Sequence, residues 1–110
     1  MDHGLATCTV GAASELLVAS DLLMRGFHVF RAVSPACPCD ILAFSAGRFC
    51  RVEVTTGYAK ADGEIGHSKP FDGAFSKFDI LATVHKQEIR YFTNLGQRLT
   101  TFDKWLSNRA

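Results

Sequence analysis

Two carboxylates, Asp40 and Glu53, stand at the two ends of a segment whose pattern predicts a β-hairpin. Apolar, strand-like stretches cover residues 40–44 and 49–55, and a short Gly-containing turn separates them. Folding this segment brings the two acids together, and like charges that face each other destabilise a sheet. A hard divalent cation held by both carboxylates converts this repulsion into a ligand pair. The segment therefore predicts a divalent-metal site.

The turn decides how the two acids pair. If Ala46 and Gly47 form a two-residue turn, Ser45 pairs with Arg48, and counting back pairs Asp40 with Glu53. A three-residue turn with Gly47 in the left-handed region would shift the pairing by one residue. Each acid also has an ordinary explanation, because Asp is common after turns and an exposed Glu is common on a sheet edge.

Strand alternation places a second polar group beside the acids. Glu53 and Thr55 share one face of their strand, together with Arg51, while Val52 and Val54 point to the other face. Asp40, Glu53 and Thr55 are therefore expected to form a small polar patch at the end of an apolar hairpin.

A third carboxylate comes from an expected helix over residues 11–26, which Gly26 ends as a left-handed cap. Glu15 falls within the apolar arc of this helix, and a carboxylate that faces a core is rarely buried without a partner. It is expected to point towards the other two acids; alternatively, it only favours the helix dipole. The arc is formed by Ala12, Leu16, Ala19, Leu22 and Leu23, with Ser14, Asp21 and Arg25 expected on the opposite side.

The remaining pattern predicts an α/β sandwich around a mixed sheet. A strand is expected over residues 27–33, before the hairpin, and two more over 78–85 and 88–93, joined by a Lys86-Gln87 turn. Residues 56–76 are expected to be mostly loop, with one short helix over 71–77. Thr100 is expected to cap a last helix with Phe102, Trp105 and Leu106 on its apolar face.

Composition limits the functions that fit. The 110 residues suit one domain, 1–110, and values of 47% hydrophobic and 21% charged residues are typical of globular proteins. No apolar run approaches the roughly 20 residues that span a bilayer, and no secretory signal is visible, so a cytoplasmic protein is expected. The net charge of +1 means that nucleic-acid binding would need a local basic patch. Cys37 and Cys39 are too closely spaced for a zinc site, so reduced thiols are expected.

The order of these motifs resembles the PD-(D/E)xK nuclease superfamily, in its restriction-endonuclease-like and Holliday-junction-resolvase-like forms. The matching residues are Gly11 and Glu15 on the first helix, Cys39-Asp40 on one hairpin strand, and Glu53-Val54-Thr55 on the next. The resemblance covers roughly residues 11–92 and implies an α-β-β-β-(α)-β-β-α sandwich. Cys39 replaces the family's proline, and Thr55 replaces the lysine of E-x-K, which orients the attacking water. Lys60 and Lys77 are candidates for a displaced lysine, or else are solvated loop residues.

The resemblance implies a metal-dependent DNA endonuclease. Asp40 and Glu53 would bind Mg²⁺ or Mn²⁺, with Glu15 in an outer position or at a second ion, and Thr55 or Lys60 would position the water. Three residues of the long loop, Tyr58, Lys60 and Lys69, would contact the DNA backbone, and His67 is a further candidate for a phosphate contact.

Two alternatives remain open from the sequence. The loss of the E-x-K lysine and the near-neutral charge favour a nuclease-like fold that has lost catalysis and binds nucleic acid or protein. The nine phenylalanines also fit an unrelated α/β protein that assembles as a homodimer through exposed aromatic side chains.

Overall fold

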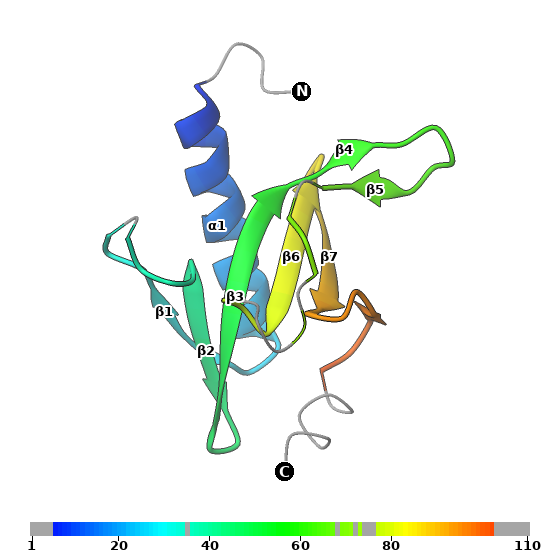
Figure 1. Ribbon diagram of the computed structural model, residues 1–110. Coiled ribbons are helices and arrows are strands. Elements are labelled where there is room, and N and C mark those ends of the chain that lie inside the picture. Colours follow the sequence, from blue (N-terminus) through cyan, green and yellow to red (C-terminus); the bar gives the residue numbers. More distant parts are fainter. Residues whose placement is uncertain (1–5, 35, 68, 72, 74–76, 103–110) are drawn as a thin grey trace.

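One long helix packs against a six-stranded mixed sheet in the computed structural model, which describes residues 6–34, 36–67, 69–71, 73 and 77–102 (Figure 1). The sheet has the order β1-β2-β3-β6-β7-β8, and a separate two-stranded ribbon is formed by β4 and β5. The elements are α1 (Thr7–Met24), β1 (His28–Arg31), β2 (Ile41–Ser45), β3 (Arg48–Thr56), β4 (Tyr58–Ala59), β5 (Ile65–Gly66), β6 (Ile80–His85), β7 (Glu88–Thr93) and β8 (Arg98–Leu99).

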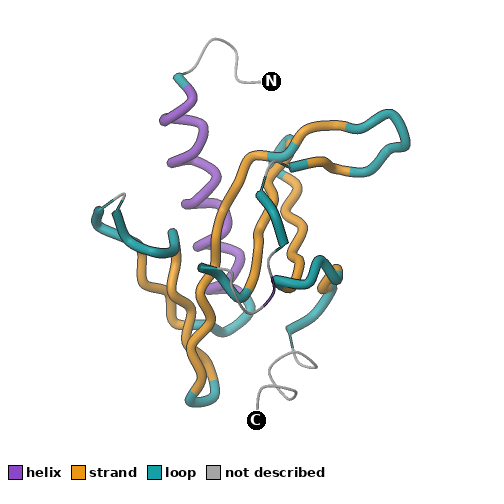
Figure 2. Tube along the Cα trace, in the orientation of Figure 1, coloured by secondary structure: helices purple, strands orange, loops and turns teal. Residues whose placement is uncertain are grey.

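The sheet is mixed because β3 and β6 run parallel while the other neighbouring strands are antiparallel. The chain leaves β3, forms the β4–β5 ribbon, and returns to begin β6 beside β3. Figure 2 shows this long connection as the loop-rich part of the molecule. The α/β class and the mixed sheet predicted from the sequence are confirmed.

The end of α1 follows from its glycine. Gly26 has a φ of 94°, which glycine adopts without steric cost. The N–H groups of Gly26 and Phe27 donate to the carbonyls of Leu23 and Leu22, each at 3.0 Å. This pair of bonds is a Schellman motif, and it satisfies carbonyls that the helix end would otherwise leave free. The predicted cap is confirmed, although the helix begins at Thr7 rather than at Gly11.

The predicted inner face of α1 was correct for Ala19 and Leu22, which are buried, but wrong at other positions. Its buried residues are Ser14, Val18, Ala19 and Leu22, whereas Leu16 and Leu23 are more than half exposed. Asp21, expected on the outer side, accepts a 2.6 Å hydrogen bond from the hydroxyl of the buried Tyr91. The helix is apolar around most of its circumference, so spacing alone could not identify the inner face.

The apolar core lies between α1 and the face of the sheet that meets it. It is built from Val18 and Leu22 of the helix and from alternate residues of the central strands: Ile41, Ala43, Cys50, Val52, Ile80, Ala82 and Val84. Strand β6 is buried on both faces, because Leu81 and Thr83 are also inaccessible. Burial on both faces is typical of a strand with a parallel neighbour at the centre of a sheet.

Helix α1 also meets a simple criterion of length and composition for crossing a membrane, with 18 residues and a mean hydropathy of 1.3, which the sequence inspection did not anticipate. That criterion is weak evidence, since core helices and signal sequences also satisfy it. In the fold, the two acids of this helix are paired, Glu15 with Arg31 and Asp21 with Arg25.

The connection between β3 and β6 and the C-terminal region differ from expectation in detail. The β4–β5 ribbon was not predicted, because each of its strands has only two residues. Strand β8 was missed for the same reason. The short helix expected over residues 71–77 falls mostly outside the described residues, as does the helix expected after Thr100.

Candidate functional site

The β2–β3 hairpin has the register that the sequence predicted. Ser45 pairs with Arg48, and Ile41 pairs with Val52. The turn is two residues long, with Ala46 at φ 54° and Gly47 at φ 76°. Two left-handed residues in succession are typical of the turn that matches the twist of a hairpin. Continuing the register by one residue places Asp40 opposite Glu53.

Asp40 lies directly before β2 and accepts hydrogen bonds from residues on both sides of it. Its backbone carbonyl accepts a 2.9 Å hydrogen bond from the N–H of Ala32, and its Oδ2 accepts a 2.8 Å bond from the N–H of Val54. The side chain thus replaces the next backbone bond of the ladder. This contact fixes the carboxylate beside Glu53, and Oδ1 has no hydrogen-bond partner in the described part of the chain.

Glu53 is paired with a lysine from the long connection. The Nζ of Lys69 lies 3.0 Å from Oε2 of Glu53, and the two side chains are 41% and 20% exposed. Lys69 lies between two aromatic residues that anchor its segment, because the rings of His67 and Phe71 lie 6.0 and 5.9 Å from that of Phe92 on β7. A lysine is therefore held at Glu53, although position 55, where the E-x-K motif has its lysine, is a threonine.

Glu15 reaches the same region from α1. Its Oε1 lies 3.6 Å from Nη2 of Arg31, and its side chain is 28% exposed. Burial raises the pKa of Glu15, the Asp40 carboxylate raises it further, Arg31 opposes the shift, and Glu53 adds a smaller increase. Since each carboxylate affects the charge of Glu15, the three predicted acids share one electrostatic environment.

The three acids do not form a closed metal cage. Within the described residues, no group of three or more His, Cys, Asp or Glu side chains is arranged to hold an ion. Asp40 and Glu53 are the pair suited to one. Magnesium commonly takes one or two carboxylates and keeps several waters, so Asp40 and Glu53 could hold such an ion with Glu15 outside the ligand pair, and the metal stays a prediction.

The other predicted residues occupy different places. Thr55 lies two residues beyond Glu53 on β3 and pairs with Thr83 of β6. Lys60 follows β4, and its Nζ lies 4.0 Å from Oδ2 of Asp62 within the β4–β5 ribbon. Tyr58 is half exposed on β4. The structure thus brings Lys69, rather than Lys60, to Glu53. Sequence reasoning assigned Lys69 only a DNA contact, because its contact with Glu53 depends on the path of the whole connection.

His67 differs from the exposed residue that a loop position would favour. It is partly buried and packs edge-on against Phe71, with ring centroids 4.9 Å apart. Its Nδ1 is buried and has no hydrogen-bond partner among the residues that the structure describes. The packing role of His67 is to hold the segment that carries Lys69.

A second ion pair organises the start of β6 beside the site. Arg51 binds Asp79 through both ends of its guanidinium, with Nε to Oδ2 at 3.2 Å and Nη2 to Oδ1 at 3.0 Å. The backbone N–H of Arg51 also donates to Oδ2 at 2.9 Å, and the N–H of Asp79 donates to the carbonyl of Arg51 at 2.8 Å. The hydrogen bonds to Asp79 raise the pKa of Arg51. These bonds fix the position at which β6 joins β3.

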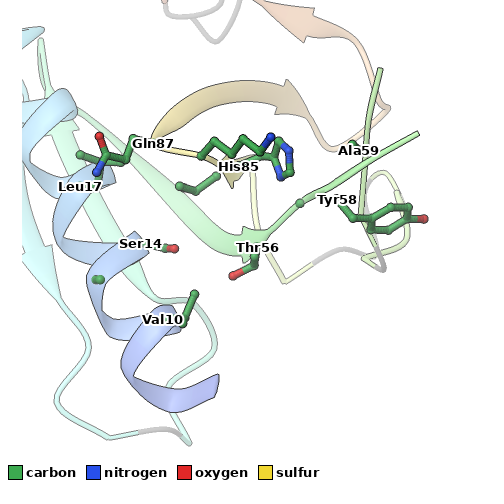
Figure 3. Close-up of a pocket in the computed structure, with 12 residues that line it drawn as sticks. Val10, Ser14, Leu17, Thr56, Tyr58, Ala59, His85 and Gln87 are labelled. Carbon is green, nitrogen blue, oxygen red and sulfur yellow. The ribbon is translucent and has the colours of Figure 1, made fainter. Parts of the chain in front are cut away.

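A partly open pocket lies elsewhere, between α1 and the ends of β3 and β6 (Figure 3). Its volume is about 420 Å³, and its lining is mostly apolar. Val10, Ser14 and Leu17 line it from α1, with Thr56, His85 and Gln87 across from them. None of Glu15, Asp40 and Glu53 contributes to it.

Comparisons with known proteins agree with this architecture. No protein-family model matches the chain. A solved structure titled as a bacterial homing endonuclease, I-Ssp6803I, superimposes with a TM-score of 0.68, covering 91% of this chain and 82% of that one. At 15% sequence identity this likeness establishes a shared, nuclease-like fold.

A curated relative gives closer sequence similarity. Protein 5.3 of Escherichia phage T7 is 34% identical over 93 residues, and the match covers 76% of each chain. The chain therefore belongs to the same family as Protein 5.3 of phage T7.

Proposed function

We propose that this protein is a metal-dependent nuclease of the PD-(D/E)xK type that hydrolyses phosphodiester bonds in DNA. The observation that carries the proposal is the meeting of Asp40, Glu53 and Lys69 at the open end of a hairpin, with Lys69 3.0 Å from Glu53. Two carboxylates and a cation are the groups that the full PD-(D/E)xK motif supplies. Here the cation comes from the connection that follows β5, rather than from position 55.

Each side chain has a distinct role in this proposal. Asp40 and Glu53 hold Mg²⁺ or Mn²⁺, which when bound lowers the pKa of a water and polarises the scissile phosphate. Lys69 stabilises the negative charge that develops on the phosphate, and its ammonium needs no reorientation over a long distance because His67 and Phe71 anchor its segment. Thr55 offers a hydroxyl that can hydrogen-bond the attacking water.

The substrate is proposed from the form of the site and from the fold. The carboxylate pair is not part of the apolar pocket, and Glu53 and Lys69 remain 20% and 41% exposed, so a polymer can approach them from the surface. The structural neighbour is titled a homing endonuclease, which supports a nucleic-acid substrate. The half-exposed Tyr58 and Lys60 on the β4–β5 ribbon are available to contact the backbone of such a substrate.

A binding module without catalysis is the second candidate, and two observed ion pairs favour it. Glu53 is neutralised by Lys69 and Glu15 by Arg31, so the acids are compensated without any metal. In that case Lys69 and Arg31 are structural, and the chain binds nucleic acid without cutting it.

Calorimetry separates the two candidates. Titration of the wild-type protein and of Asp40→Asn with MgCl₂ and MnCl₂ should give binding to the wild type alone, because the metal requires a full carboxylate at position 40. Cleavage of plasmid, four-way-junction and single-stranded DNA should then require the metal and be lost in Glu53→Gln. An absence of metal binding by the wild type would contradict the proposal, and metal binding without any cleavage would favour the binding module.

A further inference from the structure

The sheet face that carries Asp40 and Glu53 also carries a cluster of aromatic side chains. His28, Phe44 and Phe49 pair across three neighbouring strands, with ring centroids 6.1 Å apart for the first two and 4.6 Å apart for the second two. The next row along the strands contains Phe30, Leu42 and Arg51. We call the four aromatic side chains of these rows, His28, Phe30, Phe44 and Phe49, the aromatic platform.

The platform faces away from the core. Val29, Ala43 and Cys50 lie between its members along the strands and pack towards α1, so alternation turns the platform to the opposite side. Phe30 and Phe49 are 56% and 51% exposed. Such exposure is costly for side chains of this size and marks a surface that contacts something else.

On the other half of the sheet, at β6 and β7, the same face is covered by residues of the segment that follows β5. Near β6 and β7, His67 and Phe71 pack on Phe92, and Leu81 beneath is fully buried. Figure 1 shows the segment after β5 passing over this part of the sheet. Among the residues that the structure describes, no segment makes an equivalent aromatic contact with the platform. The carboxylate pair and Lys69 lie at the boundary between the closed and open halves.

The platform is continuous with the carboxylates. Rows on one face of a strand are two residues apart, roughly 6.5 Å, so the pair Asp40–Glu53 follows the row of Leu42 and Arg51 at this spacing. The row of Phe44 and Phe49 lies about 13 Å from the acids on the same basis. Between them stands Arg51, whose guanidinium is held by Asp79 and remains 42% exposed.

We propose that the aromatic platform binds the unpaired bases of a single-stranded nucleic-acid segment and delivers its backbone to Asp40 and Glu53. This inference rests on the proposed function and narrows the substrate to one with unpaired bases. Aromatic side chains on an open sheet stack on bases of any sequence. No side chain that β1, β2 and β3 contribute to these rows is a carboxylate. The guanidinium of Arg51 is compensated by Asp79 of the neighbouring strand but remains 42% exposed, so it can still donate hydrogen bonds to a phosphate.

Duplex DNA fits this surface less well. Its bases are stacked on each other, so a protein meets mainly phosphates and groove edges, which call for a field of cations. The row of His28, Phe44 and Phe49 contains no lysine or arginine, and the whole chain has a net charge of only +1. Stacking is therefore the main attraction that this half of the sheet offers.

Fluorescence anisotropy with a labelled 15-nucleotide oligothymidine tests the proposal. It is measured in EDTA on the Asp40→Asn background, so that no cleavage occurs. Phe49→Ala should weaken binding about 5-fold or more, because base stacking on one aromatic ring is worth at least this ratio. Phe49→Trp should restore the affinity, with quenching of its indole fluorescence by the bound bases. Leu16→Ala is the matched control, since Leu16 is 55% exposed on α1 and should leave binding unchanged.

The platform would be overturned if Phe49→Ala bound the oligothymidine as tightly as the wild type, or if the wild type bound a duplex of the same length more tightly than the single strand. It would also be overturned if the wild type were a dimer that Phe49→Ala converts to monomers without any loss of DNA affinity. The failure of the nuclease proposal is distinguishable from these. Single-strand binding that depends on Phe49 in a protein without metal affinity leaves the platform standing and removes the nuclease. Metal-dependent plasmid cleavage that Phe49→Ala does not slow would leave the nuclease proposal standing and remove the platform.

Discussion

The ammonium of Lys69 lies 3.0 Å from Oε2 of Glu53, although 16 positions separate the two residues in the chain. This contact predicts that Lys69→Met slows metal-dependent cleavage about 100-fold or more, the usual effect of removing one group that stabilises charge in the transition state. Metal affinity should be unchanged or slightly higher, since the competing cation is gone. Single-turnover cleavage and metal calorimetry measure the two effects separately.

Lys60→Met is the control for this experiment. Lys60 is half exposed and paired with Asp62 in the β4–β5 ribbon, away from Glu53. Its removal should change the single-turnover cleavage rate at saturating DNA less than about threefold, even where it lowers the affinity for DNA. If Lys60→Met were the slower enzyme, the catalytic lysine would be the one nearer in sequence to Glu53.

Asp40→Asn should abolish metal binding while preserving the fold. The amide keeps an oxygen that can accept the N–H of Val54, as Oδ2 of Asp40 does at 2.8 Å. Wild-type protein at a metal concentration of 100 Kd should gain about 2.7 kcal/mol in the free energy of unfolding. Asp40→Asn should gain none, and chemical denaturation with and without MgCl₂ measures the difference. An equal gain in both proteins would place the ion elsewhere.

Glu15→Gln should stabilise the metal-free protein at neutral pH. The pKa of Glu15 is raised by burial and by the nearby carboxylates, so the folded state favours its protonated form. Stability from a raised carboxyl pKa is fully present below the unfolded-state pKa and decreases as the pH rises through the folded-state value. The variant should therefore exceed the wild type by up to about 1 kcal/mol at pH 7, less whatever the lost contact with Arg31 contributes.

This difference should vanish on acidification below the ordinary range of a glutamate pKa, where both side chains are neutral. Denaturant titrations at several pH values in EDTA measure it. Glu88→Gln is a useful contrast, because Arg90 lowers the pKa of Glu88 and its effect has the opposite sign.

Asp79→Ala should destabilise the fold by about 2–3 kcal/mol. The change removes an almost buried carboxylate that binds the guanidinium and backbone of Arg51, and it leaves that guanidinium partly desolvated. Asp62→Ala, which removes an exposed acid from the β4–β5 ribbon, should cost less than about 0.5 kcal/mol. Denaturant midpoints of the two variants test the contrast, and similar midpoints would contradict the role assigned to Asp79.

Local chemistry made part of this architecture predictable. The Ala46-Gly47 turn fixed the hairpin register, Gly26 fixed the end of α1, and Lys86-Gln87 formed a second turn with both residues at positive φ, 50° and 68°. In each case a few neighbouring residues determine the backbone. The same hairpin register placed Asp40 and Glu53 across from each other before the structure was known.

Features that depend on distant contacts were not predictable. The inner face of α1 depends on the sheet, because the hydroxyl of Tyr91 donates to Asp21 and the core buries Val18, neither of which the helical spacing indicated. The approach of Lys69 to Glu53 depends on His67 and Phe71 packing on Phe92, and no local pattern records that contact. The ion pair of Asp79 with Arg51 was equally unpredictable, because it forms only when β6 lies beside β3.

The two-residue turn at Ala46 and Gly47 makes the site sensitive to chain length. One inserted residue would offset the ladder, and any slip of β3 by a single position would send Glu53 to the side of the sheet that meets α1. A two-residue insertion would preserve the facing but separate the acids along the strand. The length of this tip therefore sets the distance between the two acids at the far end of the hairpin.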